Sequence, residues 1–96
     1  MPYVHAMDFS FDPAKNIRNL EKHSLPLAFG MAVLSNMFGE IEDRRRDYGE
    51  KRMKAFGEVG GYWYQCTHTM RGTVAHIINV HRTSGKEVTK WLRPSR

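Results

Sequence analysis

Residues 51–82, KRMKAFGEVGGYWYQCTHTMRGTVAHIINVHR, decide the fold because three strand-like segments are separated by two short turns. Gly60-Gly61 supplies the two-residue connection of a tight hairpin between strands expected over 51–59 and 62–70. Arg71-Gly72 predicts a second turn before a strand over 73–82, whose apolar residues on both faces favour a central position. The stretch therefore predicts an antiparallel meander.

The residues at the start of the chain predict a strand followed by a helix. Residues 7–11 alternate apolar and polar side chains, which is the period of a half-buried strand. Asp12 can accept hydrogen bonds from the free amides of a helix that begins at Pro13. Its apolar residues recur every third position, and Lys22 and His23 mark its end.

Between this helix and the meander, Ser24 and Pro26 predict the start of a second helix. Residues 38–42 predict a short strand, and the charged residues 43–49 predict a loop. Beyond the meander, the spacing Ser-x-x-Glu at residues 84–87 is typical of a capping box.

Pro94 is expected to stop the helix that this capping box begins. Together these segments predict one α+β domain over residues 1–96. In it, two N-terminal helices pack on an antiparallel meander sheet, and a C-terminal helix follows.

Basic residues are concentrated in the second half of the chain. Up to Asp43 there are three basic and six acidic residues, whereas from Arg44 onward there are twelve basic and four acidic residues. The net charges of the two parts are −3 and +8, and the sum matches the chain's +5. Such asymmetry favours binding to a polyanion, with RNA as the expected partner. A solvated basic face that aids solubility is the alternative.

The single cysteine, Cys66, lies in an apolar stretch and is expected to be a buried thiol rather than a nucleophile. The five histidines show no metal-ligand spacing, so we expect no metal site and no cofactor. No stretch approaches the ~20 apolar residues that span a bilayer. The sequence therefore predicts a cytoplasmic protein without a membrane partner.

RNA cleavage without a metal needs a base for the 2′-hydroxyl, an acid for the leaving oxygen and cations for the phosphorane. Histidine suits the proton transfers and arginine suits the phosphate. The candidate catalytic residues lie on neighbouring predicted strands or at their ends: Glu50, Arg52, His76, His81 and Arg82. The candidate RNA-binding residues are Arg44, Arg45, Arg46, Lys51, Lys54 and Arg71.

Each of these candidates has a structural alternative. His76 shares strand parity with Val80 and can be a half-buried histidine. Its parity is opposite to that of His81, so the two can act together only if a bulge intervenes. Glu50 can simply pair with an arginine. The aromatic residues Tyr48, Tyr62 and Trp63 can stack bases, although Tyr62 and Trp63 more often belong to a sheet core.

Three fragments in order resemble one family of bacterial toxins, the BrnT family. Residues 9–23, FSFDPAKNIRNLEKH, resemble its opening F-x-[WF]-D-x-x-K-x-x-x-N-x-x-K-H pattern. Residues 43–52, DRRRDYGEKR, resemble its D-x-R-x-D-Y-G-E-x-R centre, and Thr69–Gly72 with Ile77-Ile78, Arg82 and Glu87 resembles its closing segment. The likeness extends from Phe9 to Leu92.

The resemblance implies a RelE-like fold and a ribonuclease toxin of a type II toxin-antitoxin system that inhibits translation. It further implies neutralisation by an antitoxin with a ribbon-helix-helix domain, and contact with operator DNA only through that antitoxin. His76 and His81 stand where the family usually has arginine, Asn79 replaces a usual serine, and Ser24 replaces a usual glycine. These departures motivate a second hypothesis, a BrnT-like module that binds protein or nucleic acid without cleaving RNA.

Overall fold

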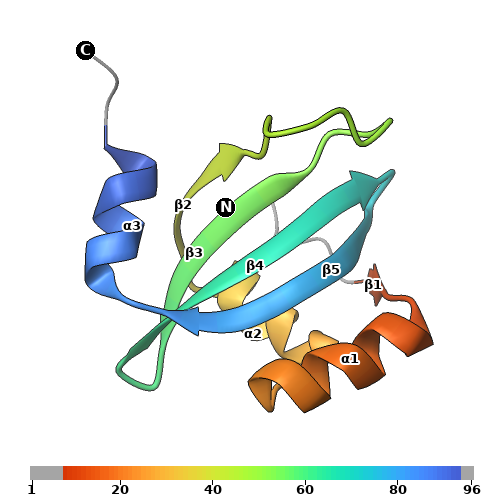
Figure 1. Ribbon diagram of the computed structural model, residues 1–96, viewed down its shortest axis with the longest axis horizontal. Coiled ribbons are helices and arrows are strands. Elements are labelled where there is room, and N and C mark those ends of the chain that lie inside the picture. Colours follow the sequence, from red (N-terminus) through yellow and green to blue (C-terminus); the bar gives the residue numbers. More distant parts are fainter. Residues whose placement is uncertain (1–7, 94–96) are drawn as a thin grey trace.

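The computed structural model describes residues 8–93 and combines a mixed five-stranded sheet with three α-helices and a 3₁₀ helix (Figure 1). The strands are β1 (Asp8–Ser10), β2 (Met37–Glu42), β3 (Met53–Val59), β4 (Tyr62–Arg71) and β5 (Val74–Thr83). The helices are α1 (Pro13–His23), the 3₁₀ helix η1 (Leu27–Phe29), α2 (Gly30–Ser35) and α3 (Gly85–Leu92). The order of strands across the sheet is β1-β5-β4-β3-β2.

Strands β2 to β5 form the antiparallel meander that the turn residues predict. Gly60 and Gly61 join β3 to β4 with φ values of +59° and +86°, and Gly72 joins β4 to β5 with a φ of +64°. Side chains rarely tolerate such backbone angles, so glycine at these positions fixes the turns and thereby the register of the hairpins. The loop predicted over residues 43–49 extends to residue 52, so β3 begins at Met53 and not at Lys51.

The prediction of a wholly antiparallel sheet is wrong for the first strand. β1 pairs with β5 in the parallel direction, with Phe9 opposite Ala75 and Ser10 opposite His76. No tight turn joins these two strands, so nothing local in the sequence determines their relative direction. Met7, which the alternating pattern includes, lies outside the described residues.

The prediction of a second helix from Ser24 is also corrected. Ser24 ends α1 in the left-handed conformation, with a φ of +59°, and its N–H donates to the carbonyl of Leu20. Pro26 then precedes η1, and α2 begins at Gly30. A residue at this left-handed position is usually glycine, which is the residue that the resemblance described above implies in place of Ser24.

The hydrophobic core lies between one face of the sheet and the helices η1 and α2. Its buried residues are Leu27, Val33, Leu34, Ala55, Cys66, Ala75, Ile77 and Val80. Burial raises the pKa of the Cys66 thiol, which confirms the expectation of a buried cysteine. In Figure 1, α2 lies behind the sheet, α1 lies beside β5 and α3 lies beyond β2.

Helix α3 begins where the capping pattern predicts. The hydroxyl of Ser84 accepts a hydrogen bond of 3.1 Å from the N–H of Glu87. The helix packs on the sheet face opposite to the core, since the Trp91 ring lies over the Lys54 ammonium at 3.9 Å. Pro94 lies outside the described residues. No helix in the described part of the chain is long and apolar enough to cross a membrane.

Helix α1 is attached to the sheet by the side-chain amide of Asn19. This nitrogen donates to the carbonyls of Leu25 and Val80 at 2.8 Å each, and the amide oxygen accepts from the N–H of Val80 at 3.2 Å. Among the residues of α1, all of which the structure describes, Asn19 alone is buried. The position of α1 beside β5 therefore depends strongly on one polar side chain.

We expect the Asn19→Ala variant to lose about 2–3 kcal/mol of unfolding free energy, because it leaves buried backbone groups of Val80 without their partner. Urea denaturation followed by tryptophan fluorescence measures this loss. Asn36→Ala is the matched control, since the Asn36 amide makes an exposed hydrogen bond to the Ala32 carbonyl, and it should cost under about 1 kcal/mol. Equal losses in both variants would contradict the anchoring role.

Candidate functional site

A row of polar side chains crosses the sheet face opposite to the core. The register places Lys54 of β3 beside Thr67 of β4, and Thr67 beside Asn79 of β5. In the next row on this face, Gln65 of β4 lies beside His81 of β5. Because successive side chains alternate between the two faces, these residues form one continuous polar floor.

A bulge in β5 determines which histidines reach this floor. Thr67 pairs with Asn79, but His68 pairs with Ile77, so Ile78 is an extra residue on β5. Such a bulge reverses the alternation of side chains beyond it. His76 therefore shares a face with His81 and not with Val80. This bulge is the condition under which the sequence allowed the two histidines to lie on one face.

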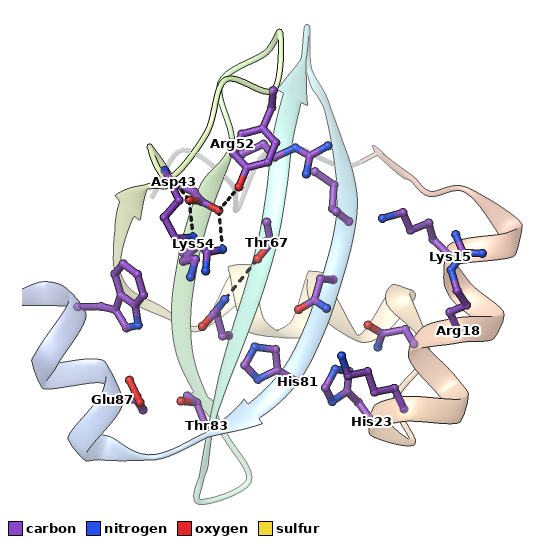
Figure 2. Close-up of a pocket in the computed structure, with 18 residues that line it drawn as sticks. Lys15, Arg18, His23, Asp43, Arg52, Lys54, Thr67, His81, Thr83 and Glu87 are labelled. Atoms are coloured by element: carbon purple, nitrogen blue, oxygen red, sulfur yellow. Dashed lines mark hydrogen bonds and ion pairs between the residues drawn. The ribbon is translucent and has the colours of Figure 1, made fainter.

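The polar floor lies in an open groove of about 680 Å³ between α1, α3 and the loop before β3 (Figure 2). Helix α1 contributes Lys15, Arg18, Asn19, Lys22 and His23, and α3 contributes Glu87 and Trp91. The loop over residues 43–52 contributes Asp43, Arg45, Tyr48 and Arg52. We call this feature the groove.

The groove is strongly basic. Among the described residues, six Lys and Arg side chains and two carboxylates line it: Lys15, Arg18, Lys22, Arg45, Arg52 and Lys54, with Asp43 and Glu87. Three of these cations belong to the part of the sequence with net charge −3, so counting charges along the chain missed half of the basic lining. Their spacing of three and four residues was the available signal, because it places them on one side of a helix.

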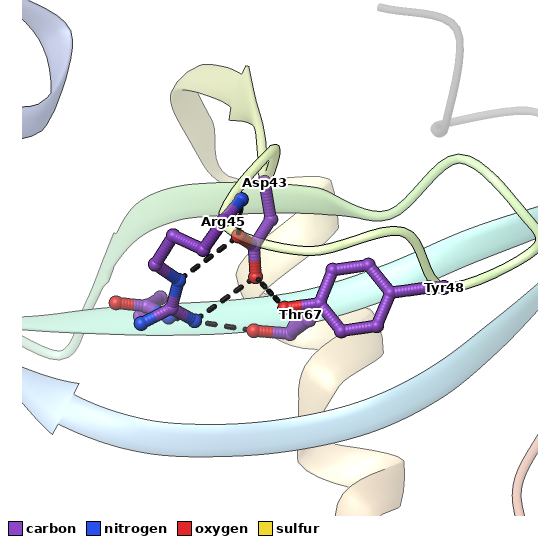
Figure 3. Close-up of polar contacts among 5 residues, drawn as sticks. Asp43, Arg45, Tyr48 and Thr67 are labelled. Carbon is purple, nitrogen blue, oxygen red and sulfur yellow. Dashed lines mark hydrogen bonds and ion pairs between the residues drawn. The ribbon is translucent and has the colours of Figure 1, made fainter.

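Asp43 organises the loop that closes one end of the groove (Figure 3). Its carboxylate accepts two hydrogen bonds of 2.9 Å from the Arg45 guanidinium and one of 3.1 Å from the Tyr48 hydroxyl. The hydrogen bonds from Arg45 hold the pKa of Asp43 well below its usual range, although burial opposes them. The D-x-R-x-x-Y spacing of the sequence thus corresponds to a fixed arrangement of side chains.

Two cations in the groove lie against aromatic rings. The Arg52 guanidinium lies 4.2 Å from the centre of the Tyr48 ring, and the Lys54 ammonium lies 3.9 Å from the centre of the Trp91 ring. Lys54 is 4% exposed, and burial followed by the neighbouring Arg45 charge lowers its pKa. Trp91 was not among the aromatic residues that the sequence suggested for base stacking.

Three of the five candidate catalytic residues gather in a smaller cavity of about 90 Å³ that adjoins the groove. Glu50, Arg52 and His76 line it together with Arg71, and Arg52 also lines the groove. The Glu50 carboxylate lies 3.3 Å from the Arg71 guanidinium and 4.0 Å from that of Arg52. Nδ1 of His76 lies 2.7 Å from the Ser10 hydroxyl, and burial, followed by the Arg71 charge, lowers the pKa of His76.

The other two candidates lie on opposite faces of β5. His81 lines the groove, whereas Arg82 is not among the groove residues and its guanidinium lies 4.0 Å from the centre of the Tyr62 ring. Adjacent residues of a strand point in opposite directions, which explains the separation. The structure therefore does not bring Arg82 together with the other four.

The imidazole of His81 has a defined orientation. Its Nδ1 lies 2.9 Å from the backbone carbonyl of Arg82, and a carbonyl oxygen only accepts hydrogen bonds, so Nδ1 carries the proton. In the neutral ring, Nε2 is then the proton acceptor.

The candidate RNA-binding residues divide in a similar way. Arg45 and Lys54 line the groove, and Arg71 lines the adjoining small cavity. Arg44, Arg46 and Lys51 are exposed and are not among the residues that line the groove. Arg44 pairs instead with Glu42 at 3.1 Å. In the described part of the chain, no cluster of three or more His, Cys, Asp or Glu side chains can hold a metal ion.

A basic groove with a polar floor, on one face of a mixed α+β sheet, defines a small protein suited to bind a polyanion. The chain belongs to the BrnT family, described as "Ribonuclease toxin, BrnT, of type II toxin-antitoxin system", whose profile matches residues 11–87. This match confirms the resemblance that the three sequence fragments indicate. No individual curated protein is similar enough in sequence to count as a relative.

The three cations on α1 should make the binding of RNA depend on salt. We expect the Lys15→Gln/Arg18→Gln/Lys22→Gln variant to lower the slope of log affinity against log salt by about 2, since each single-strand phosphate contact contributes roughly 0.7. Fluorescence anisotropy with a 2′-O-methyl oligonucleotide, which is not cleaved, measures the slope.

The matched control is Lys86→Gln/Lys90→Gln/Arg93→Gln. It removes the same charge from exposed positions on and just after α3 that do not line the groove. We expect it to change the slope much less. The same change in both variants would mean that the groove is not the site of phosphate contact.

Proposed function

We propose that the chain is an endoribonuclease that cleaves RNA without a metal ion, using the groove as its active site. The observation that supports this proposal best is a histidine of defined orientation, His81, on a floor surrounded by six Lys and Arg side chains. This arrangement combines a proton-transfer group with cations suited to a phosphate.

The cations of the groove are suited to bind the RNA backbone and the charge that develops on phosphorus. Arginine presents several N–H donors in a plane that matches two phosphate oxygens, and lysine contributes a compact charge. Lys15, Arg18 and Lys22 lie on one wall, while Arg45 and Arg52 lie at the loop end. A phosphate on the floor between them would meet cations from both sides.

His81 is suited to take the proton from the attacking 2′-hydroxyl. The hydrogen bond from its Nδ1 to the Arg82 carbonyl directs the lone pair of the neutral ring to Nε2. The adjacent cavity is small, but its arginines, Arg52 and Arg71, which also engage the Glu50 carboxylate, are suited to contact a flanking phosphate at its edge. Arg44, Arg46 and Lys51 can contact RNA farther along the strand.

The proposed RNA cleavage would give the chain the effect of a toxin in the cell. A toxin of this kind would inhibit translation by cutting RNA in the cytoplasm, on a RelE-like fold, and would be neutralised by an antitoxin. We propose that this antitoxin carries a ribbon-helix-helix domain and that operator DNA is contacted only through it.

The purified protein should cut RNA in the presence of EDTA, and the His81→Ala variant should cut it about 10²-fold or more slowly, since general acid–base groups contribute rate factors of this size. The products are expected to end in a 2′,3′-cyclic phosphate and a 5′-hydroxyl. Denaturing gel electrophoresis of an end-labelled RNA measures both rate and products. Lys90→Ala, on the exposed side of α3, is the control variant and should cut normally.

Two outcomes would contradict this proposal in different ways. Cleavage that is abolished by EDTA and restored by a divalent cation would overturn the metal-independent mechanism. Tight RNA binding with no cleavage, with or without ribosomes, would instead favour the BrnT-like binding module. The groove weighs against that alternative, because the departures at His76 and His81 place proton-transfer groups on its floor or in the adjoining cavity.

Expression of the chain alone should stop the growth of the host cell, and co-expression of a small ribbon-helix-helix protein encoded beside it should restore growth. The His81→Ala variant, expressed to the same level, should permit growth because RNA remains intact. Incorporation of labelled methionine measures translation directly. Undisturbed translation during expression of the unmodified chain would rule out the toxin activity.

A further inference from the structure

His23 at the end of α1 faces His81 across one side of the groove (Figure 2). The centres of the two imidazole rings are 5.1 Å apart, and the ring planes are tilted by 31°. His23 comes from the sequence pattern Lys-His at the end of the first helix, which the sequence alone explained as a favourable helix ending. The structure places this ring within the groove, where it can also contact a bound ligand.

The position of His23 is determined by the same contact that attaches α1 to the sheet. His23 follows Asn19 by four residues, so both side chains lie on one face of α1. Asn19 bonds to the backbone of Val80, the residue immediately before His81. The left-handed Ser24, whose N–H donates to the Leu20 carbonyl, ends the helix directly after His23. The backbone positions of α1 and β5 therefore bring the two rings close together.

We propose that His23 and His81 are the proton-transfer pair of the ribonuclease, with His81 as the base and His23 as the acid. His81 takes the proton of the 2′-hydroxyl as the 2′-oxygen forms a bond to phosphorus. The bond from phosphorus to the 5′-oxygen breaks, and that oxygen receives the proton of the His23 imidazolium. The step balances as a cyclic phosphate, a 5′-hydroxyl, one protonated His81 and one neutral His23.

The distance between the rings is compatible with His81 as the base and His23 as the acid. The 2′-oxygen and the 5′-oxygen are both bonded to the same phosphorus in the transition state, on opposite sides of it. Two rings whose centres lie 5.1 Å apart, on one side of the phosphate, can each reach one of these oxygens. The cations on the two groove walls would hold the phosphate in place between the walls.

The charges of the groove oppose a state in which both imidazole rings are protonated at once. Burial, followed by the charges of His81 and Lys22, lowers the pKa of His23. The lower pKa makes its imidazolium a stronger acid but leaves less of the ring protonated before the anionic phosphate binds. Two neighbouring imidazolium ions repel each other, whereas the negative charge of a bound phosphate stabilises a single imidazolium beside it. The other charged groups of the groove are Lys15, Arg18, Arg45, Arg52 and Lys54, with the carboxylates Asp43 and Glu87.

This inference rests on the proposed ribonuclease activity, and a modified leaving group separates the two. A dinucleotide in which sulfur replaces the bridging 5′-oxygen releases a thiolate, which needs no acid because a thiol is far more acidic than an alcohol. We expect His23→Ala to cut ordinary RNA about 10²-fold more slowly but to cut the sulfur-bridged dinucleotide at nearly the normal rate. His81→Ala should cut both substrates slowly.

His23→Gln is the second variant, since glutamine is polar, has a similar reach and cannot transfer a proton. The affinity of both variants for a 2′-O-methyl oligonucleotide, measured in parallel, separates any loss of binding from the loss of the chemical step. A similar loss on both substrates, or no loss on either, would overturn the role of His23 while leaving the ribonuclease activity in place. If the unmodified chain cuts neither substrate in EDTA, the proposed function falls and the pair falls with it.

Discussion

The hydrogen bonds of Asn19 are the constraint on which the groove depends. A helix on a protein surface is ordinarily held by an apolar stripe, but the apolar residues Ile17 and Leu20 of α1 are 57% and 42% exposed. The buried amide of Asn19 instead joins the helix to both backbone groups of Val80. This contact leaves the other long side chains of that helix side, above all Lys15 and Lys22, available to line the groove.

The bulge at Ile78 provides the second half of the geometry. Without the extra residue, a regular strand that keeps Asn79 and His81 on the floor would also direct Ala75 and Ile77 toward it and His76 into the core. With it, the core side keeps Ala75, Ile77 and Val80, and the other side receives His76, Asn79, His81 and Thr83 together with the apolar Ile78. Bulges often adjust side-chain direction near active sites, and this one separates an apolar face from a polar face within ten residues.

Local signals in the sequence predicted the elements whose causes are local. The Gly60-Gly61 and Arg71-Gly72 turns, the cap at Ser84 and the loop after Asp43 follow from backbone angles or short hydrogen bonds. The features that the sequence did not predict depend on contacts between distant segments. These features are the parallel direction of β1, the bulge in β5 and the basic wall on α1. Each is determined by the segment that packs beside it and not by its own residues alone.

The histidines at positions 76 and 81, where the family resemblance implies arginine, differ from arginine in how they carry charge. Arginine carries a permanent charge, whereas histidine gains and loses a proton near neutral pH. The resemblance described above implies arginine at positions 76 and 81, where this chain has histidine. His81 lies in the groove and His76 in the adjoining cavity, and cations from α1 and from the loop line both. In such an arrangement the walls can supply the charge that binds phosphate, and the floor is free to carry groups that move protons. If the proposed ribonuclease mechanism holds, the substitutions redistribute the two tasks between walls and floor instead of removing one of them.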